Sequence, residues 1–405
     1  MLTISAFAVG QFAFVTSVFL VVGLLPAMAA EFNLPLSTVA QAVGLFSLVY
    51  ALAAPILSAA AGTANRRWLL VGAVALFSLS NVAAAVTTDF DLLLAMRLVG
   101  AACDGFYAAT ATAIAASMAS PERRGRALSI VNSGITVAFV IGVPLGTFIG
   151  YSLGWRAGFW FLAIVGAIST AGLMISLPRE LRLTRVASIA DRVGTLLQPS
   201  VLALVCVTVL SYAGVFAVYT FIAPALKQLT GLQGASVSVY LMIFGVSAIV
   251  GNWAGGYLTD VWKPNWTMMG SFLVLAALLA FYPALMANVV GAAVLMAVLG
   301  FVHYTALCPL QHRFVAMNPA QADVVMGLCF SAFYLGIATA ALIGGRVLTA
   351  DGIASLGYAA SALKIGAAGA LAVSLYWLNK PAPVAGLPAA AGLSHPSALI
   401  KESQV

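Results

Sequence analysis

The prediction of the fold begins with residues 92–118, which read LLLAMRLVGAACDGFYAATATAIAASM. The stretch is apolar apart from Arg97 and Asp104, and it is long enough to cross the hydrocarbon core of a bilayer as one helix. Asp104 lies 13 residues beyond Asp91 (104 − 91), or about 20 Å along such a helix. We therefore expect its carboxyl group near the middle of a membrane, where a carboxylate must be protonated, paired or wetted.

The whole-chain composition also indicates a membrane protein. The 405 residues are 63% hydrophobic and only 7% charged, whereas roughly a quarter of the residues in a soluble domain are charged. The net charge of +7 is not arranged as a basic stripe with interleaved aromatics, so we expect no nucleic-acid partner. The four cysteines lie in apolar runs without CxxC spacing, and no P-loop or catalytic constellation occurs. The sequence thus predicts no enzyme, no metal site and no cofactor.

Twelve apolar runs approach or exceed the length of a membrane-spanning helix. They lie near residues 5–29, 37–61, 68–87, 92–118, 127–150, 157–177, 200–226, 235–259, 266–286, 289–311, 323–348 and 355–378. The small residues at 26–30 are typical of a signal-peptidase site, but the first run is long and no basic residue precedes it. We therefore expect a retained first helix and an all-α membrane protein with 12 transmembrane helices.

A longer charged segment divides the runs into two sets of six. We predict an N-terminal six-helix bundle (1–178), a cytoplasmic linker (179–198), a C-terminal six-helix bundle (199–380) and a disordered tail (381–405) rich in Pro, Ala, Gly and Ser.

Basic residues predict the orientation of the two bundles. With the N-terminus in the cytoplasm, 13 Lys and Arg residues fall on the inner side, and Arg156, Lys227, Arg346 and Lys364 fall on the outer side. This bias favours cytoplasmic termini in a bacterial inner membrane.

The fifth run carries glycines at a spacing that exposes one helix face. Gly142, Gly146 and Gly150 are four residues apart and permit close approach of another helix, while Pro144 removes a backbone hydrogen bond. The pattern fits either ordinary tight packing or a flexible hinge face where the two bundles meet.

This segment resembles the antiporter motif of the major facilitator superfamily, in particular of its drug:proton antiporter branch of bacterial sugar, nucleoside and drug efflux permeases. Further segments of the chain agree with that branch, namely 23–26, 97–105, 121–126, 154–156, 251–260, 309–313 and 331–336. The resemblance covers about residues 5–380. It implies two rocking bundles around a central cavity and is not specific for a substrate.

Three positions depart from the family pattern. Val18 stands where the branch usually has an acid in helix one, Asp104 stands where close relatives often have His, and Gly62 replaces the Asp of the loop before Arg66 and Arg67. The proton-coupling carboxylate is therefore expected on helix four rather than helix one. The inner gate would depend on Arg66, Arg67, Arg123, Arg126 and Asp260, the last as a charge latch or simply as a solvated loop charge.

Arg97 and Asp104 are seven residues apart, so they share a helix face but lie about 10 Å apart along the axis, too far for a direct salt bridge. Burial favours the neutral acid and a nearby cation favours the carboxylate, so Asp104 can act as a proton acceptor. Alternatively it is a structural partner for Arg97 or for an amide on another helix. Arg97 either organises packing and water or attracts an anionic substrate. The family resemblance favours a structural role and a role in relaying protons, which places Arg97 with Asp104 among the proton-coupling candidates.

Polar and aromatic residues elsewhere are candidates for a substrate cavity or for core packing. They are Gln11, Gln41, Asn132, Tyr212, Tyr219, His303, Tyr304 and Tyr334. We expect a monomeric secondary transporter that exports a small organic solute by proton antiport. The alternatives are a proton-coupled uptake symporter for a nutrient and a non-transporting membrane sensor.

Overall fold

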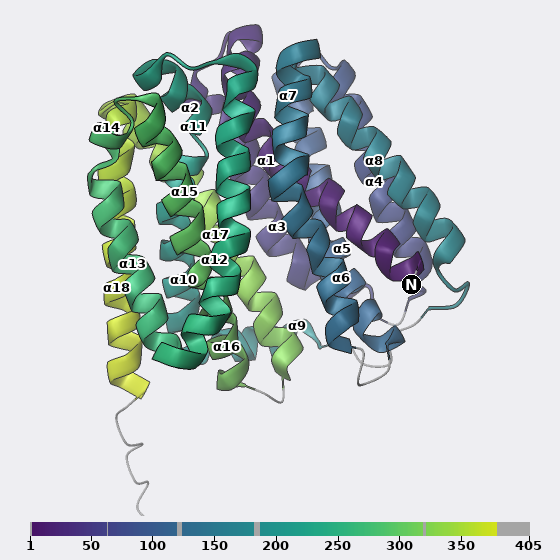
Figure 1. The fold of residues 1–405 in the computed structure, drawn as a ribbon. Coiled ribbons are helices and arrows are strands. Elements are labelled where there is room, and N and C mark those ends of the chain that lie inside the picture. The colour runs from purple at the N-terminus through teal and green to yellow at the C-terminus, as the bar shows by residue number, and fades with distance from the viewer. Residues whose placement is uncertain (1, 63, 120–123, 182–186, 319–320, 379–405) are drawn as a thin grey trace, which may run out of the picture.

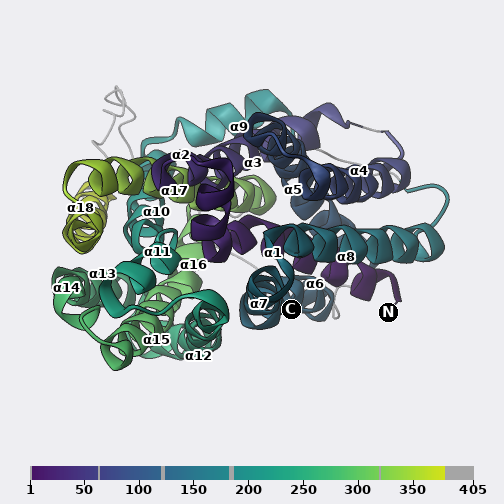
Figure 2. The ribbon, with the colours of Figure 1, turned by 90° about the horizontal axis from the view of Figure 1, so that it is seen from above.

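Helices account for the architecture of this protein. The computed structural model describes residues 2–62, 64–119, 124–181, 187–318 and 321–378. In these ranges, eleven helices are long and apolar enough to cross a membrane, and the shorter apolar helix Pro264–Ala280 supplies a twelfth candidate span. Figures 1 and 2 show helices α4–α8 gathered on one side and α10–α18 on the other, with α1, α2 and α3 nearest the boundary. The expected all-helical fold with twelve spans in two halves is confirmed.

Six spans form the N-terminal half. Its helices are α1 (Leu2–Phe32), α2 (Leu36–Val39), α3 (Gln41–Ala60), α4 (Arg66–Val86), α5 (Phe90–Met118), α6 (Arg124–Val137), the π-helical turn η2 (Ala138–Gly142), α7 (Val143–Leu153) and α8 (Trp155–Ser176). At one end of this half, Arg156 forms an ion pair with Glu31 and donates to the Thr87 carbonyl at 2.8 Å. This contact ties the end of α1 to the start of α8.

Six further spans form the C-terminal half. Its helices are α10 (Pro199–Tyr219), α11 (Ile222–Ala225), η3 (Leu226–Thr230), η4 (Gly234–Ser236), α12 (Val237–Trp262), α13 (Pro264–Ala280), α14 (Tyr282–Leu285), α15 (Val289–Thr305), α16 (Leu307–Met317), α17 (Ala322–Ala350), η6 (Ile353–Ser355) and α18 (Leu356–Leu378). Several spans are therefore two shorter helices in succession.

The segment between the halves contains a helix that the sequence patterns did not predict. Helix α9 (Ile189–Leu196) begins with a capping box between Ser188 and Asp191. The Thr195 hydroxyl donates to Gln321 Oε1 at 2.7 Å, which attaches α9 to the start of α17. The predicted tail 381–405 lies outside the described residues.

Two seams join the halves. At the first, α3 meets α17: the rings of Tyr50 and Tyr334 stack 3.5 Å apart, and a Cβ atom on Gly44 would lie 2.9 Å from the Ala341 side chain. At the second, α12 meets the η2 turn: a Cβ atom on Gly245 would lie 2.4 Å from the Phe139 carbonyl oxygen. Both seams thus depend on side chains small enough for backbones to approach closely.

The glycine face of the fifth span packs inside its own half. Cβ atoms on Gly142, Gly146 and Gly150 would meet Thr16, Leu20 and Leu24 of α1, at 2.1, 2.7 and 2.7 Å. The hypothesis that this face lies between the two bundles is therefore wrong for these glycines. The glycines serve tight packing on α1, while Phe139, just before them, makes the contact with the other half.

Pro144 explains the irregular turn beside that contact. Proline has no backbone N–H and its ring crowds the carbonyl four residues earlier, which an α-helix cannot accommodate without adjustment. The adjustment is the π-helical turn Ala138–Gly142, directly before Pro144. The loss of a backbone hydrogen bond expected at Pro144 is thus accommodated by a widened turn.

We predict that Gly251→Ala destabilises the C-terminal half. A Cβ atom there would lie 2.1 Å from the Phe301 carbonyl oxygen of α15, so the backbones must separate, at a cost of about 1–3 kcal/mol. The matched control is Gly270→Ala on α13, where a Cβ atom meets nothing within 4 Å. Unfolding temperatures of the purified protein in detergent should fall for the first variant only. Equal shifts for both would contradict the packing argument.

Candidate functional site

Arg97 connects three helices in the interior of the N-terminal half. Its side chain is buried on α5, and Nη1 donates to the Ser17 carbonyl at 2.7 Å and to the Ser17 hydroxyl at 2.9 Å on α1. Nη2 donates to the Ala42 carbonyl of α3 at 3.5 Å, and the guanidinium carbon lies 4.5 Å from the centroid of the Phe46 ring. Arg97 therefore stabilises the packing of α1, α3 and α5.

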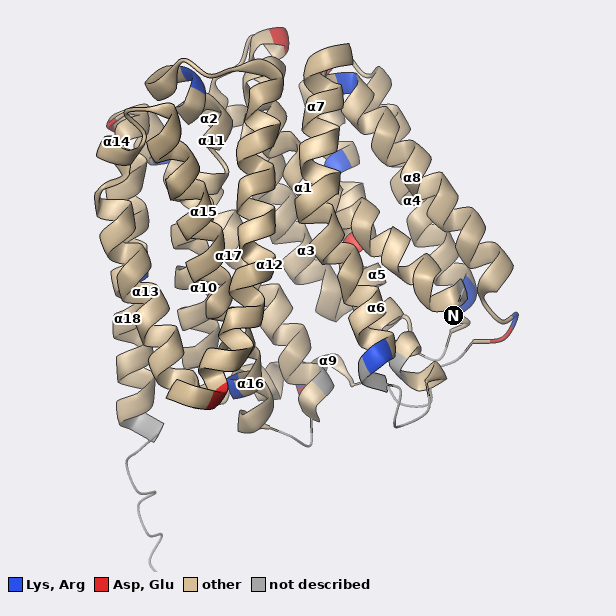
Figure 3. Ribbon diagram, viewed as in Figure 1, with Lys and Arg blue, Asp and Glu red and all other residues tan. Residues whose placement is uncertain are grey.

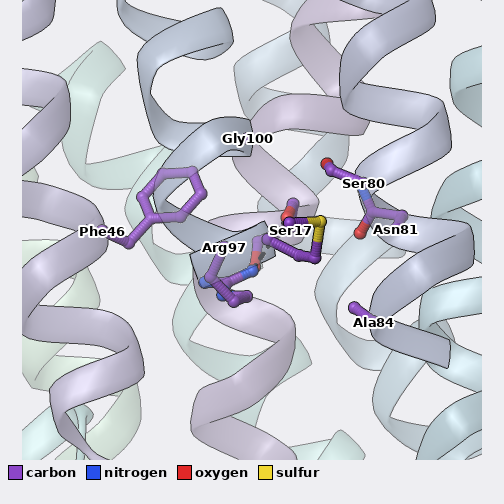
Figure 4. Close-up of a pocket in the computed structure, with 8 residues that line it drawn as sticks. Ser17, Phe46, Ser80, Asn81, Ala84, Arg97 and Gly100 are labelled. Atoms are coloured by element: carbon purple, nitrogen blue, oxygen red, sulfur yellow. Dashed lines mark hydrogen bonds between the residues drawn. The ribbon is translucent and has the colours of Figure 1, made fainter. Parts of the chain in front are cut away.

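A small polar cavity lies beside this arginine (Figure 4). Its volume is about 10 Å³, which is close to the space that one water molecule requires. The cavity is lined by Ser17, Phe46, Ser80, Asn81, Ala84, Met96, Arg97 and Gly100. Because Nε of Arg97 has no hydrogen-bond partner among the described residues, a single water at this position would have a donor to bind.

Asp104 lies within α5, in the interior of the N-terminal half. It is 0% exposed, and neither carboxyl oxygen has a hydrogen-bond partner among the described residues. As the spacing predicts, Arg97 bonds elsewhere and makes no salt bridge with it. The adjacent Gly105 lets the backbone of α3 approach, since a Cβ atom there would lie 2.9 Å from the Ala54 nitrogen.

The surroundings of Asp104 place it at a seam between the halves. The carboxyl group is near enough to interact electrostatically with Tyr50 of α3 and Tyr334 of α17. These are the two rings that stack across the first seam. The buried acid of the N-terminal half thus lies near the contact with the C-terminal half.

A cluster of aromatic rings fills the centre of the protein between the halves. We call it the central aromatic cluster, and its members are Phe19, Phe139, Tyr212, Phe216, Tyr219, Phe244, His303, Tyr304 and Phe333. The halves meet where Phe19 stacks on Phe216, with ring centroids 5.3 Å apart, and where Phe139 contacts Phe244 at 6.2 Å. Four of the predicted cavity residues lie together here: Tyr212, Tyr219, His303 and Tyr304.

The other predicted cavity residues lie apart from this cluster. Tyr334 stacks on Tyr50 beside Asp104. Gln11 is buried next to Gly134, between α1 and α6. Gln41 and Asn132 are exposed on the surface of the described structure. The sequence identifies these as polar groups in apolar runs, but it does not reveal which face of the helix carries them.

The predicted gate residues make different kinds of contact. Arg66 is buried and donates to the Gly62 carbonyl at 2.7 Å, and Arg67 donates to the Met174 carbonyl at 2.6 Å and to that of Leu177. Both arginines thus bind helix ends within the N-terminal half. Arg126 and Asp260 are exposed and make no ion pair with any described residue, and Arg123 lies outside the described residues.

Lys364 is a buried group that the count of basic residues treated as an outer charge. The predicted run 355–378 already contains it, and in the structure it lies within α18 and is 0% exposed. It therefore does not belong in the loop count, which leaves three outer basic residues instead of four. A signal was available, since Lys364 follows Leu356, the first residue of α18, by eight positions (364 − 356), or about 12 Å of helix.

The structure combines two six-span halves with a buried acid and an aromatic cluster between the halves. This combination is typical of membrane transporters that move solutes between two helical bundles. The family model of the Major Facilitator Superfamily matches residues 7–341. The chain therefore belongs to the Major Facilitator Superfamily, whose members are transporters and not enzymes. It is a multi-pass membrane protein.

Individual proteins agree with that assignment. The chain is 30% identical over 353 residues to the inner membrane transport protein YdhP of Escherichia coli (strain K12), covering 87% of this chain and 89% of the relative. It is 33% identical over 257 residues to a chloramphenicol resistance protein of Streptomyces lividans, covering 62% of this chain and 65% of the relative. The fold matches a bacterial homologue of the human lysosomal transporter Spinster in an inward-facing and occupied conformation, with a TM-score of 0.74, 15% identity, and coverage of 92% and 96%.

We predict that Arg97→Gln destabilises the N-terminal half. The change removes charge-assisted hydrogen bonds to Ser17 and Ala42, which corresponds to a loss of about 2–3 kcal/mol. Arg126→Gln is the matched control because Arg126 is exposed. The unfolding temperature in detergent should fall for Arg97→Gln and stay within error for Arg126→Gln. An unchanged value for Arg97→Gln would show that these bonds do not hold the helices.

Proposed function

We propose that this protein exports a small organic solute in exchange for protons by alternating access, as expected for the drug:proton antiporter branch. The observation that carries the proposal is the setting of Asp104. The acid is fully buried, has no hydrogen-bond partner among the described residues and lies beside the Tyr50–Tyr334 contact. A group that loads and releases protons must be able to exist in two protonation states under two different exposures.

The physical cycle follows from the difference in hydration between states. A carboxylate without a partner in a low-dielectric interior is unfavourable, so the occluded form favours the protonated acid. Opening of the α3–α17 seam separates Tyr50 from Tyr334 and admits water to Asp104, which favours release of the proton. The same opening repositions the two halves around the cargo. Proton movement and cargo movement are coupled because both depend on one rearrangement.

The central aromatic cluster supports an organic cargo. Aromatic and aliphatic solutes bind in pockets that are mostly apolar and contain a few polar groups. Here the rings come from both halves, and two buried polar atoms among them, the Tyr219 hydroxyl and Nε2 of His303, have no partner among the described residues. Chloramphenicol, which a relative is named for, combines an aromatic ring with polar groups and is the natural first probe.

The remaining parts of the proposal concern location and gating. The bias of basic residues supports a bacterial inner membrane with both termini in the cytoplasm, and Figure 3 shows charged residues gathered mainly at the two ends of the helices. We assign the protein a monomeric state.

The hinge would be the η2 turn before Pro144, and the latch would pair Asp260 with the basic residues of the inner loops when the cytoplasmic side closes.

The first test is transport into inverted membrane vesicles or proteoliposomes. We expect an imposed pH gradient to drive chloramphenicol movement opposite to the proton flow. Asp104→Asn should reduce this gradient-driven transport to the level of vesicles without the protein, because Asn carries no titratable proton. Asp91→Asn, at the exposed start of the same helix, is the control and should keep wild-type rates. Undiminished gradient-driven transport by Asp104→Asn would remove Asp104 from the mechanism.

The direction of coupling separates export from the rival function. A proton-coupled symporter would move its cargo in the same direction as the protons, and substrate counterflow would be stimulated by protons on the cargo side. The same vesicles therefore distinguish the two functions without new variants. A protein that moves no cargo in either gradient, yet is folded, would favour the sensor.

The latch generates a separate prediction. Because Asp260 is exposed and unpaired in the described structure, Asp260→Asn should leave the unfolding temperature unchanged here. If the latch forms in the other state, the variant should slow transport and shift the distribution of spin-label distances across the cytoplasmic ends. Asp351→Asn, exposed at the start of the last span, is the control. Wild-type rates and distances for Asp260→Asn would eliminate the latch.

A further inference from the structure

Another buried ionisable group, Lys364, lies in the C-terminal half, away from Asp104. Lys364 Nζ is 2.9 Å from the Ser211 hydroxyl of α10 and 3.5 Å from Nδ1 of His303 on α15. It also lies 5.3 Å from the centroid of the Phe272 ring on α13. The lysine is thus surrounded by α10, α13 and α15 and meets no carboxylate of the described residues.

The packing around Lys364 indicates a built site. A Cβ atom on Gly214 would lie 3.0 Å from Lys364 Cγ, so the absence of a side chain there makes room for the lysine stem. Burial of a lysine without a counter-ion is unfavourable, and a residue that serves packing alone would be better replaced by an apolar one. The position therefore calls for a role for the amine.

The chemistry of the amine constrains its neighbour. The contact between Lys364 Nζ and Nδ1 of His303 has two possible directions, set by the tautomer of the ring. When Lys364 carries its proton, the ammonium has three hydrogens to donate and no lone pair, so Nδ1 of His303 is then the acceptor. A neutral imidazole carries one proton, which is then on Nε2. Nε2 is buried and has no hydrogen-bond partner among the described residues. The pair thus provides an unused N–H donor inside the protein.

The unused donor belongs to the central aromatic cluster. The His303 ring packs edge-on against Tyr212, with centroids 4.6 Å apart, and against Phe216 and Tyr304 at 6.2 and 5.3 Å. Phe216 in turn stacks on Phe19 of the opposite half. A donor among rings from both halves is suited to a flat, apolar cargo that carries one acceptor oxygen.

We propose that Lys364 is a positioning residue that holds His303 in the Nε2–H tautomer, and that this N–H binds a carbonyl, carboxylate or nitro oxygen of an aromatic cargo. The inference rests on the proposed function, because it assumes that cargo passes through the central aromatic cluster. It adds the recognition chemistry and a residue, Lys364, that does not touch the cargo itself.

The tautomer is tested first, by nitrogen NMR of the full chain labelled with ¹⁵N-histidine, with the His303 signals assigned by their loss in His303→Gln. We expect a protonated Nε2 and a bare Nδ1 in the wild type, and loss of that preference in Lys364→Met. Lys227→Met, an exposed lysine in the same half, should leave the spectrum unchanged, and Lys364→Arg should retain the preference. A proton on Nδ1 in the wild type, or an unaltered tautomer in Lys364→Met, would overturn the inference.

Cargo recognition is tested by equilibrium binding of chloramphenicol to the purified protein. The Gln amide nitrogen occupies the position of Nε2 and the Asn amide nitrogen that of Nδ1, so His303→Gln should bind nearly as well as the wild type. His303→Asn and Lys364→Met should bind chloramphenicol about tenfold more weakly. This change in affinity corresponds to the loss of one hydrogen bond worth about 1.4 kcal/mol. Equal weakening by Gln and Asn, or no binding by the wild type, would reject this donor.

The two proposals fail in different ways. Loss of gradient-driven transport in Asp104→Asn with unchanged chloramphenicol affinity supports proton coupling and does not involve His303. If the wild type binds chloramphenicol through His303 but does not move it against a pH gradient, proton antiport is wrong and the recognition site stands.

Discussion

The interior of a membrane protein offers no water to a buried charge, and this constraint explains the arrangement of the ionisable groups here. Arg97 meets it with carbonyl and hydroxyl acceptors from two neighbouring helices, and Lys364 meets it with Ser211 and the His303 ring. Asp104 has no such partner among the described residues. Two of these three groups are thus held in place by the fold, and the third is the one that gains and loses a proton in the proposed cycle.

Small residues make the relation between the halves possible. Gly44 brings α3 close to α17, and Gly245 brings α12 close to the η2 turn, so the two seams are backbone contacts as much as side-chain contacts. Between the seams, aromatic rings from both halves fill the centre. Among the described residues no ion pair crosses this interface of backbones and flat rings, which suits the movement of the two bundles in the proposed cycle.

Much of this structure follows from the sequence, because hydrophobic run length is a strong signal for membrane helices. The twelve runs, the isolation of Asp104 from Arg97 and the irregularity at Pro144 were all predictable. The sequence did not predict which way individual side chains face or how deeply they are buried. It counted Lys364 among the outer charges without showing that its side chain is buried, left open whether the glycine face of the fifth span meets the other half, and missed α9. Run boundaries do not determine which helix face meets which neighbour.

The stacked pair Tyr50 and Tyr334 has a consequence for energy conservation. One ring belongs to each half, and both lie beside Asp104. In the proposed cycle, water cannot reach the acid while the rings remain stacked, and the rings cannot part unless the halves move. Proton leak, in which protons cross down their gradient without cargo transport, is then opposed by the stacked rings themselves and needs no separate gate. Under the same proposal, a smaller side chain in place of either tyrosine would let protons leak.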